Sequence, residues 1–255
     1  LLNKKGSLAL PANRKYKPVF IGKTDADKKY NYISFAPALG YNLYDKFMIG
    51  GLVHNYTLPF RSFQFIAAPV YATGSKKLNG IARATYSWYP DNGAIEQIEA
   101  GISAAKFSVN TYTDSAGKIT YLQLAKLAPH IRVGFRNNDA RSLLSRFAQF
   151  KIYHINRGQL NFSWDSVEMI NKYAVLNKAT TFAQLRYVTE NSRALYPYRW
   201  ELQFDMSKTF GRLAYTGNYF FNFPRNGGGL NVRWFAGKFF YVGDKTSAKR
   251  FETDA

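Results

Sequence analysis

The amino-acid sequence predicts an all-β fold in which antiparallel strands form a transmembrane β-barrel. Three observations predict it: polar and apolar residues alternate over long stretches, turn-forming clusters separate these stretches, and aromatic residues make up 17% of the chain. A period of two places successive side chains on opposite faces of a strand. Aromatic residues favour strands, and in outer-membrane barrels they also form girdles at both membrane interfaces.

The clearest alternation spans residues 198–206. One face carries Tyr198, Trp200, Leu202, Phe204 and Met206, and the other carries Arg199, Glu201, Gln203 and Asp205. In a soluble antiparallel sheet, the polar face looks at bulk water and the apolar face at a packed core. The same pattern also suits a strand with lipid outside and a wet, salt-bridged lumen inside. Charged residues in the middle of other strands favour the barrel, because a dry core would make them costly.

Extended segments and turns alternate from residue 30 almost to the end of the chain. Strands are expected at residues 30–39, 46–56, 62–71, 78–89, 94–108, 119–135, 146–155, 180–190, 198–206, 211–221 and 229–242, with a break at Pro129 left open. Hairpin turns are expected where Gly, Asn, Asp and Pro cluster, at residues 42–45, 73–77, 90–93, 114–117, 137–139 and 224–228. Several strands reach the roughly 9–11 residues that a tilted membrane strand needs. The best helix candidates, residues 140–147 and 166–176, fit a loop or a strand equally well.

Glycines inside the expected strands favour a closed sheet. Gly50, Gly51, Gly80, Gly101 and Gly134 suit close approach and sharp coiling of the strands. Long antiparallel strands also need protected edges, and closure removes the edges. The sequence therefore predicts a barrel of about eleven or twelve strands, complete in itself or part of a larger barrel.

The net charge and the composition limit which partners the chain can have. The chain has 35 Lys and Arg against 16 Asp and Glu, a formal net charge of +19, which indicates an anionic partner such as nucleic acid, anionic lipid headgroups or an acidic polysaccharide. A solvated basic surface is the alternative. Nucleic acid is disfavoured, because the alternation puts cations and aromatic rings on opposite faces, whereas a stacking platform needs them together. With no cysteine, the chain has neither a disulfide scaffold nor a cysteine metal site, and no apolar run approaches the ~18 residues of a membrane helix.

Sequence motifs for chemistry are missing. His54, His130 and His154 are isolated, and each is expected to be a polar lumen or interface residue rather than a metal ligand. Glu96 and Glu99 are expected on opposite faces of a strand, which makes them a poor acid–base pair. The chain has no zinc-peptidase HExxH, no GxSxG, no phosphate loop and no dinucleotide-binding motif. The sequence therefore predicts no catalytic, cofactor-binding or metal-binding residues and no cofactor.

The expected domain boundary follows the first residues. Residues 1–29 are basic and poorly periodic and are expected to form a linker or N-terminal extension, and residues 30–255 the barrel. The chain begins without an initiator Met or a signal-peptide core and ends without an apolar strand. Both ends are interpreted as cut, and the barrel as incomplete at its C-terminus.

Three segments, residues 41–51, 69–80 and 100–108, carry a resemblance to a known family. Residues 41–51 and 69–80 resemble the early hairpins of the C-terminal outer-membrane barrel of Bacteroidetes surface proteins, including proteins whose upstream part is a gluzincin-type metallopeptidase, and the later residues 100–108 fit the same pattern. Their layout is similar to the barrel of the outer-membrane assembly-factor and surface-antigen superfamily. The resemblance covers residue 30 to the end and rests on structural hairpins, so it carries over no catalytic residue. It implies that any zinc-binding helix precedes Leu1 and that further strands follow Ala255.

Three functions are compatible with these patterns. The first is a barrel in the bacterial outer membrane that anchors an attached domain, implied to be a metallopeptidase, with lipopolysaccharide and other outer-membrane proteins as partners. The second is a barrel that inserts or translocates proteins at the outer membrane. The third is a soluble basic β-protein that binds an anionic polymer. Whether the whole protein is an enzyme is left open, because any activity would reside in an upstream domain.

Overall fold

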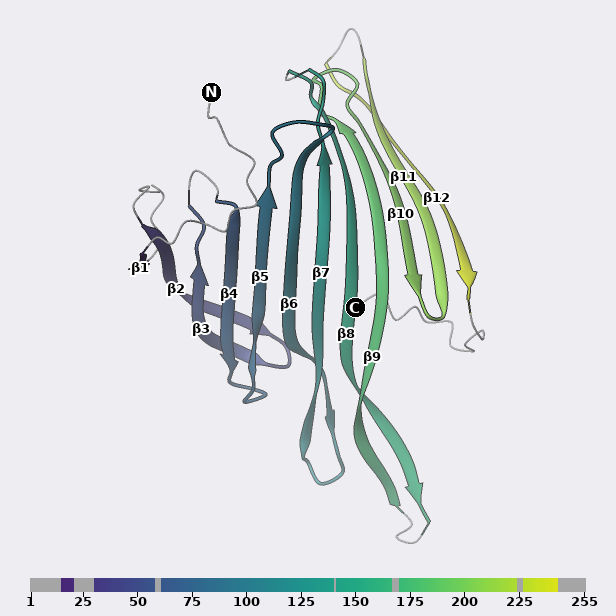
Figure 1. Cartoon of the computed structure of the whole chain (residues 1–255). Helices are drawn as coiled ribbons and strands as arrows, with labels where there is room; N and C mark the ends of the chain where they lie inside the picture. The colour runs from purple at the N-terminus through teal and green to yellow at the C-terminus, as the bar shows by residue number, and fades with distance from the viewer. Residues whose placement is uncertain are drawn as a thin grey trace.

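The computed structural model describes residues 15–20, 30–57, 61–139, 141–166, 170–223 and 227–242. In these ranges the chain forms one twelve-stranded sheet in which spatial order follows sequence order (Figure 1). The strands are β1 (Tyr16–Phe20), β2 (Asn31–Asn42), β3 (Lys46–His54), β4 (Phe63–Ala72), β5 (Leu78–Trp88), β6 (Ile95–Thr113), β7 (Ile119–Phe135), β8 (Leu144–Asp165), β9 (Ile170–Asn191), β10 (Tyr198–Ser207), β11 (Phe210–Asn222) and β12 (Gly229–Tyr241). The pair β1–β2 is parallel and the other pairs are antiparallel. The all-β, antiparallel prediction is confirmed.

The eleven predicted strands are found, and their lengths are the main difference. β7 has the predicted bounds and runs through Pro129, which pairs with Ile102 of β6. On its other side, the pairing with β8 skips Ala128 and Pro129, because proline has no N–H to donate to a ladder. β8 and β9 are much longer than predicted and take up residues from both helix candidates. β1 lies in the range expected to be a linker.

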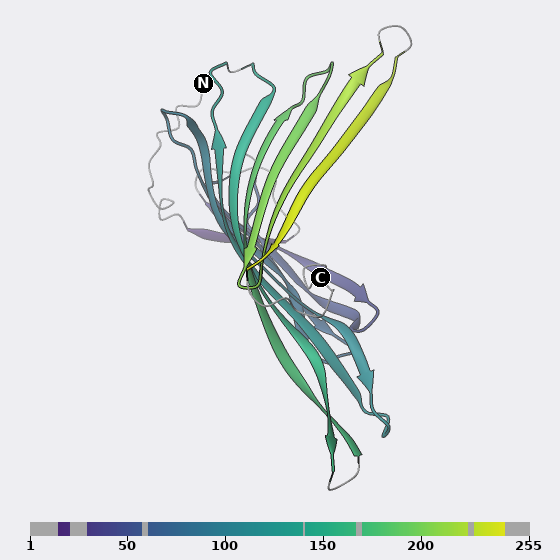
Figure 2. The ribbon, with the colours of Figure 1, turned by 90° about the vertical axis from the view of Figure 1, so that its right-hand side faces the viewer.

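The sheet is strongly twisted and is not closed. Viewed from the side, the strands fan apart, as the right-handed twist of long strands produces (Figure 2). The hairpins β6–β7 and β8–β9 project beyond their neighbours (Figure 1). Within the described ranges β1 and β12 are the two edges of the sheet, so barrel closure is not seen there.

The sheet curves toward one face. Met48 of β3 and Val70 and Ala72 of β4 form a buried apolar cluster, against which Phe107 of β6 packs. β5 lies between β4 and β6 in the sheet, so this contact skips a strand and requires the sheet to bend around the cluster. The first half of the sheet is therefore coiled around a small core.

A buried carboxylate fixes this coil. Asp45, in the turn between β2 and β3, is 0% exposed. Its Oδ2 accepts from the Ser108 backbone N–H of β6 at 2.8 Å and from Asn42 Nδ2 at 3.0 Å, and its Oδ1 accepts from the Ser75 hydroxyl of the next hairpin. Burial acts to raise the pKa of Asp45, but these hydrogen bonds outweigh it and hold the pKa below the usual aspartate value. One charged side chain thus joins two hairpin turns to β6.

Replacing Asp45 by Asn is expected to lower the free energy of unfolding by about 1.5–3 kcal/mol at neutral pH, because hydrogen bonds to a charged group are lost. A lowered folded-state pKa stabilises the fold above the unfolded pKa, and this stabilisation is lost as the pH falls through the folded pKa. The difference between wild type and Asp45→Asn should therefore shrink below about pH 4. Urea unfolding, followed by tryptophan fluorescence over a pH series, measures this difference in the free energy of unfolding.

The matched control is Asp139→Asn, an exposed turn aspartate whose Oδ1 accepts from the Arg141 N–H at 2.9 Å within its own turn. Asp139→Asn should lower the free energy of unfolding by less than Asp45→Asn does. Equal losses for the two variants, or a difference that does not change with pH, would contradict the role assigned to Asp45.

Candidate functional site

The two faces of the sheet are inverted relative to a soluble protein. On β10, Trp200, Leu202 and Met206 are 46–50% exposed, whereas Asp205 on the other face is 2% exposed. We call the face with Trp200, Leu202 and Met206, and the residues in register with them, the outer face. The opposite face, with Arg199, Glu201, Gln203 and Asp205, is the inner face.

The inversion extends across the sheet. Following the strand register, the outer face carries large apolar residues that are 40–81% exposed: Leu39, Phe47, Ile49, Tyr71, Ile102, Ile131, Phe150, Leu185, Leu202 and Leu213. The inner face carries residues that are at most 8% exposed: Ser34, Met48, Val70, Thr85, Ala128, His130, Val188 and Asp205. Some apolar residues are exposed on the inner face and depart from the pattern: Ile81 of β5, Leu176 of β9, and Phe235 and Tyr241 of β12. Monomeric soluble proteins rarely expose an apolar surface this large, so the outer face marks an interaction surface.

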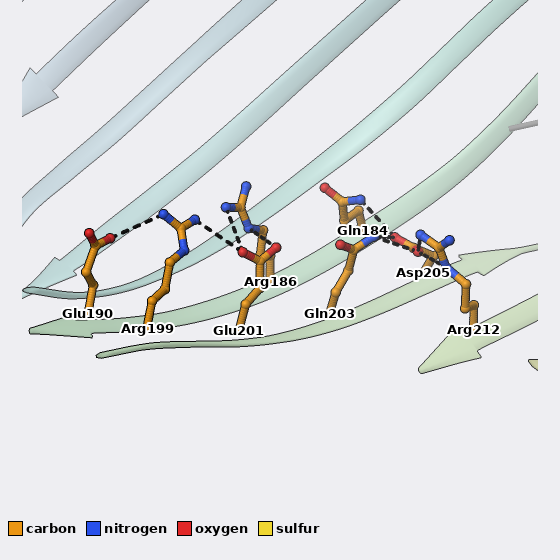
Figure 3. A network of polar contacts seen from close by, with 8 residues as sticks. All are labelled: Gln184, Arg186, Glu190, Arg199, Glu201, Gln203, Asp205 and Arg212. Carbon is orange, nitrogen blue, oxygen red and sulfur yellow. Dashed lines mark hydrogen bonds and ion pairs between the residues drawn. The ribbon is translucent and has the colours of Figure 1, made fainter. Parts of the chain in front are cut away.

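An ion-pair ladder crosses the inner face of β9, β10 and β11 (Figure 3). Arg199 bonds Glu190 and Glu201, each at 3.2 Å, and Arg186 Nε lies 2.7 Å from Glu201. The register explains the contacts, because Arg199 is directly opposite Glu190 and Gln203 is directly opposite Arg186. The charged side chains of residues 198–206 therefore find partners both within β10 and on the neighbouring strands.

Asp205 ends this ladder as its most buried member. It accepts from Gln184 Nε2 at 2.9 Å, from Gln203 Nε2 at 2.8 Å and from Arg212 Nε at 2.8 Å (Figure 3). Arg212 also pairs with Asp205 through Nη2, and its side chain is 45% exposed. A carboxylate with three donors is well compensated for its burial.

A second polar cluster joins β5, β6 and β7. Glu99 Oε1 lies 3.1 Å from His130 Nε2 and 3.4 Å from Arg83. His130 is packed over Gly101, where a Cβ atom would meet His130 Cε1 at 2.6 Å and Thr85 Cγ2 at 2.7 Å. The glycine is required here because the imidazole occupies the space of its missing side chain.

Gly101→Ala is expected to push His130 away from Glu99 and to lower the free energy of unfolding by about 1–3 kcal/mol, the cost of overpacking. Gly51→Ala is the control, because a Cβ there has no atom within 4 Å. That control should leave stability unchanged or slightly raised, since alanine restricts the unfolded chain. The same unfolding assay compares them, and equal stability of the two variants would refute the packing argument.

The structure places the other residues considered from sequence apart from one another. His54 Nδ1 accepts from the Tyr56 N–H at 3.2 Å, and His154 Nδ1 lies 2.8 Å from Thr181 Oγ1. Glu96 is exposed at a register shift between Ile95 and Gln97, whereas Glu99 lies in the His130 cluster. Among the described residues no group of three metal-ligating side chains is assembled.

Comparison with models of known protein families, with curated proteins and with solved structures finds no match for this chain. In the part of the chain that the structure describes, no helix has the length and apolar character to cross a membrane. What the chain does is therefore inferred from the geometry of its two faces.

Proposed function

We propose that this chain is an outer-membrane β-barrel that anchors an attached domain at the membrane. The observation that carries the proposal is the inversion of the sheet: exposed apolar residues on the outer face and hydrogen-bonded charges on the inner face. Transmembrane barrels have this arrangement, because their outer residues meet lipid and their inner residues meet a polar lumen.

The size of the apolar surface supports the proposal. On β10 the outer residues run from Tyr198 to Met206, within a strand of 10 residues. At about 3.3 Å per residue and a tilt of about 40°, such a run covers roughly 23 Å along the membrane normal. The apolar band of outer-membrane barrels is about 25 Å tall.

The proposal includes closure of the sheet. In lipid, each backbone N–H and C=O group must be paired, so an open strand edge is not stable there. The outer edges of β1 and β12 must therefore meet each other or further strands. The attached domain is proposed from the resemblance to metallopeptidase-linked barrels.

Cell fractionation tests the proposal. The source cells are separated into membrane fractions and washed with alkaline carbonate, and the protein is run boiled and unboiled on a detergent gel. We expect retention in the outer membrane and a heat-dependent change in mobility, because a closed barrel resists detergent until it is heated. Release into the wash with no change in mobility would overturn the barrel and support the soluble anion-binding alternative.

A further inference from the structure

The inner face is divided by charge into two regions. Across β9 (from Phe182 onward), β10 and β11, three cations are matched by three carboxylates: Arg186, Arg199 and Arg212 against Glu190, Glu201 and Asp205. This region is the balanced region. Its pairs neutralise one another, so it presents little net charge to the space in front of it.

The neighbouring region, across β5 to β8, is cationic. Along the strand direction, the stretch of inner face from Arg132 to Arg157 carries one carboxylate, Glu99, and five cations: Arg83, Lys126, Arg132, Lys151 and Arg157. Glu99 is already shared between His130 and Arg83. We call this the cationic region, and about four of its positive charges have no carboxylate partner on the same stretch of the inner face.

Aromatic rings hold several of these cations in place. The Nζ atoms of Lys126 and Lys151 lie 4.8 and 4.9 Å from the ring centroid of Tyr153, and Arg132 Cζ lies 3.9 Å from that of Phe147. A ring face attracts a cation without cancelling its charge. The rings therefore position the cations on the wall and leave them able to attract an anion.

The cations follow one another along the wall. Arg132 and Lys126 are six residues apart on β7, about 20 Å at roughly 3.3 Å per residue. Along the strand direction, Lys151 of β8 lies between Arg132 and Lys126, because it pairs with His130. Arg157 of β8 lies past Lys126, because it pairs with Leu124. An anion that moves along this wall meets a positive charge at each successive level.

We infer that the cationic region is a pathway for small inorganic anions such as chloride and phosphate, so that the barrel conducts them in preference to cations. Rings and rows of Lys and Arg select anions in pores because they attract the ion at several weak sites in succession. The balanced region, which adjoins the cationic region through the pairing of β8 with β9, continues the wall without a net opposing charge. This inference rests on the proposed function, since a pathway exists only in a closed barrel in a membrane.

Ion conductance in planar lipid bilayers tests the inference with protein purified from the outer membrane. A potassium chloride gradient gives the ratio of chloride to potassium permeability. We expect a ratio above one in the wild type and a several-fold lower ratio in Lys126→Glu with Lys151→Glu. The control, Lys76→Glu with Lys118→Glu, makes the same change in net charge at two exposed lysines in the turns β4–β5 and β6–β7 and should keep the wild-type ratio.

The outcomes separate this inference from the proposed function, because the heat-dependent mobility shift is read on the same samples. A shifted, membrane-inserted protein that shows no conductance, no anion preference, or the same ratio in both double variants overturns the pathway and leaves the anchor in place. A protein that neither inserts nor shifts overturns both. A lower ratio in the inner-face variant alone, with its mobility shift intact, establishes the pathway.

Discussion

Leu202→Arg is expected to weaken insertion of the chain and to lower the fraction that shows the heat-dependent mobility shift. Leu202 is the central outer residue of the run 198–206 and is 46% exposed, so in the proposed barrel it faces the middle of the lipid. An arginine at the lipid midplane of a barrel costs about 2–4 kcal/mol. This is a large part of the 5–15 kcal/mol that usually stabilises a folded protein. Carbonate extraction and the detergent gel measure the result.

The matched control places the same side chain on the other face of the next strand. Thr216 of β11 is directly opposite Glu201 on the inner face, where an arginine can join the ladder. Thr216→Arg should insert and shift like the wild type. If both variants insert equally well, the outer face does not meet lipid and the proposed function is wrong.

Asp205→Ala is expected to lower the free energy of unfolding by about 2–3 kcal/mol. The substitution removes the acceptor of Gln184, Gln203 and Arg212 together, and unsatisfied donors beside a charged partner cost this much. The partial exposure of Arg212 keeps the loss below the 3–5 kcal/mol of a fully buried broken pair. Urea unfolding in detergent gives the value.

Glu190→Ala is the comparison for Asp205→Ala, because it removes a carboxylate from the exposed end of the same ladder. Glu190 is 42% exposed at its side chain and pairs with Arg199 at 3.2 Å. Solvent screens such a pair, so its loss should cost about 1 kcal/mol or less. A larger loss for Glu190→Ala than for Asp205→Ala would mean that burial does not set the strength of the ladder.

The sequence predicted the strands and their two faces because both depend on a local period of two. The bounds of β7 and the face assignment along β10 needed no information beyond neighbouring residues. The partners in the ion pairs were harder to predict from the sequence. The alternation places Glu201 on the same face as Arg199 of its own strand, but Glu201 also pairs with Arg186 of β9, which only the register brings close.

Features that depend on distant parts of the chain could not be read from the sequence. Asp45 meets the Ser108 N–H, 63 residues away, and no local pattern marks that contact. β8 and β9 continue past their alternating parts because each supplies the other with backbone partners along 22 residues. The short strand β1 carries no alternating pattern of its own and forms by pairing with β2. Closure depends on the edges of the whole sheet, and no single segment encodes it.

The order of the sheet also bears on how the protein folds. Each strand from β2 to β12 pairs with the strand before it in sequence, and most of the connecting turns are short. Closing a short loop costs little conformational entropy, so each hairpin can form before distant parts of the chain meet. From β2 to β12 the sheet can therefore grow by one hairpin at a time, each new strand pairing with the edge that the previous strand provides.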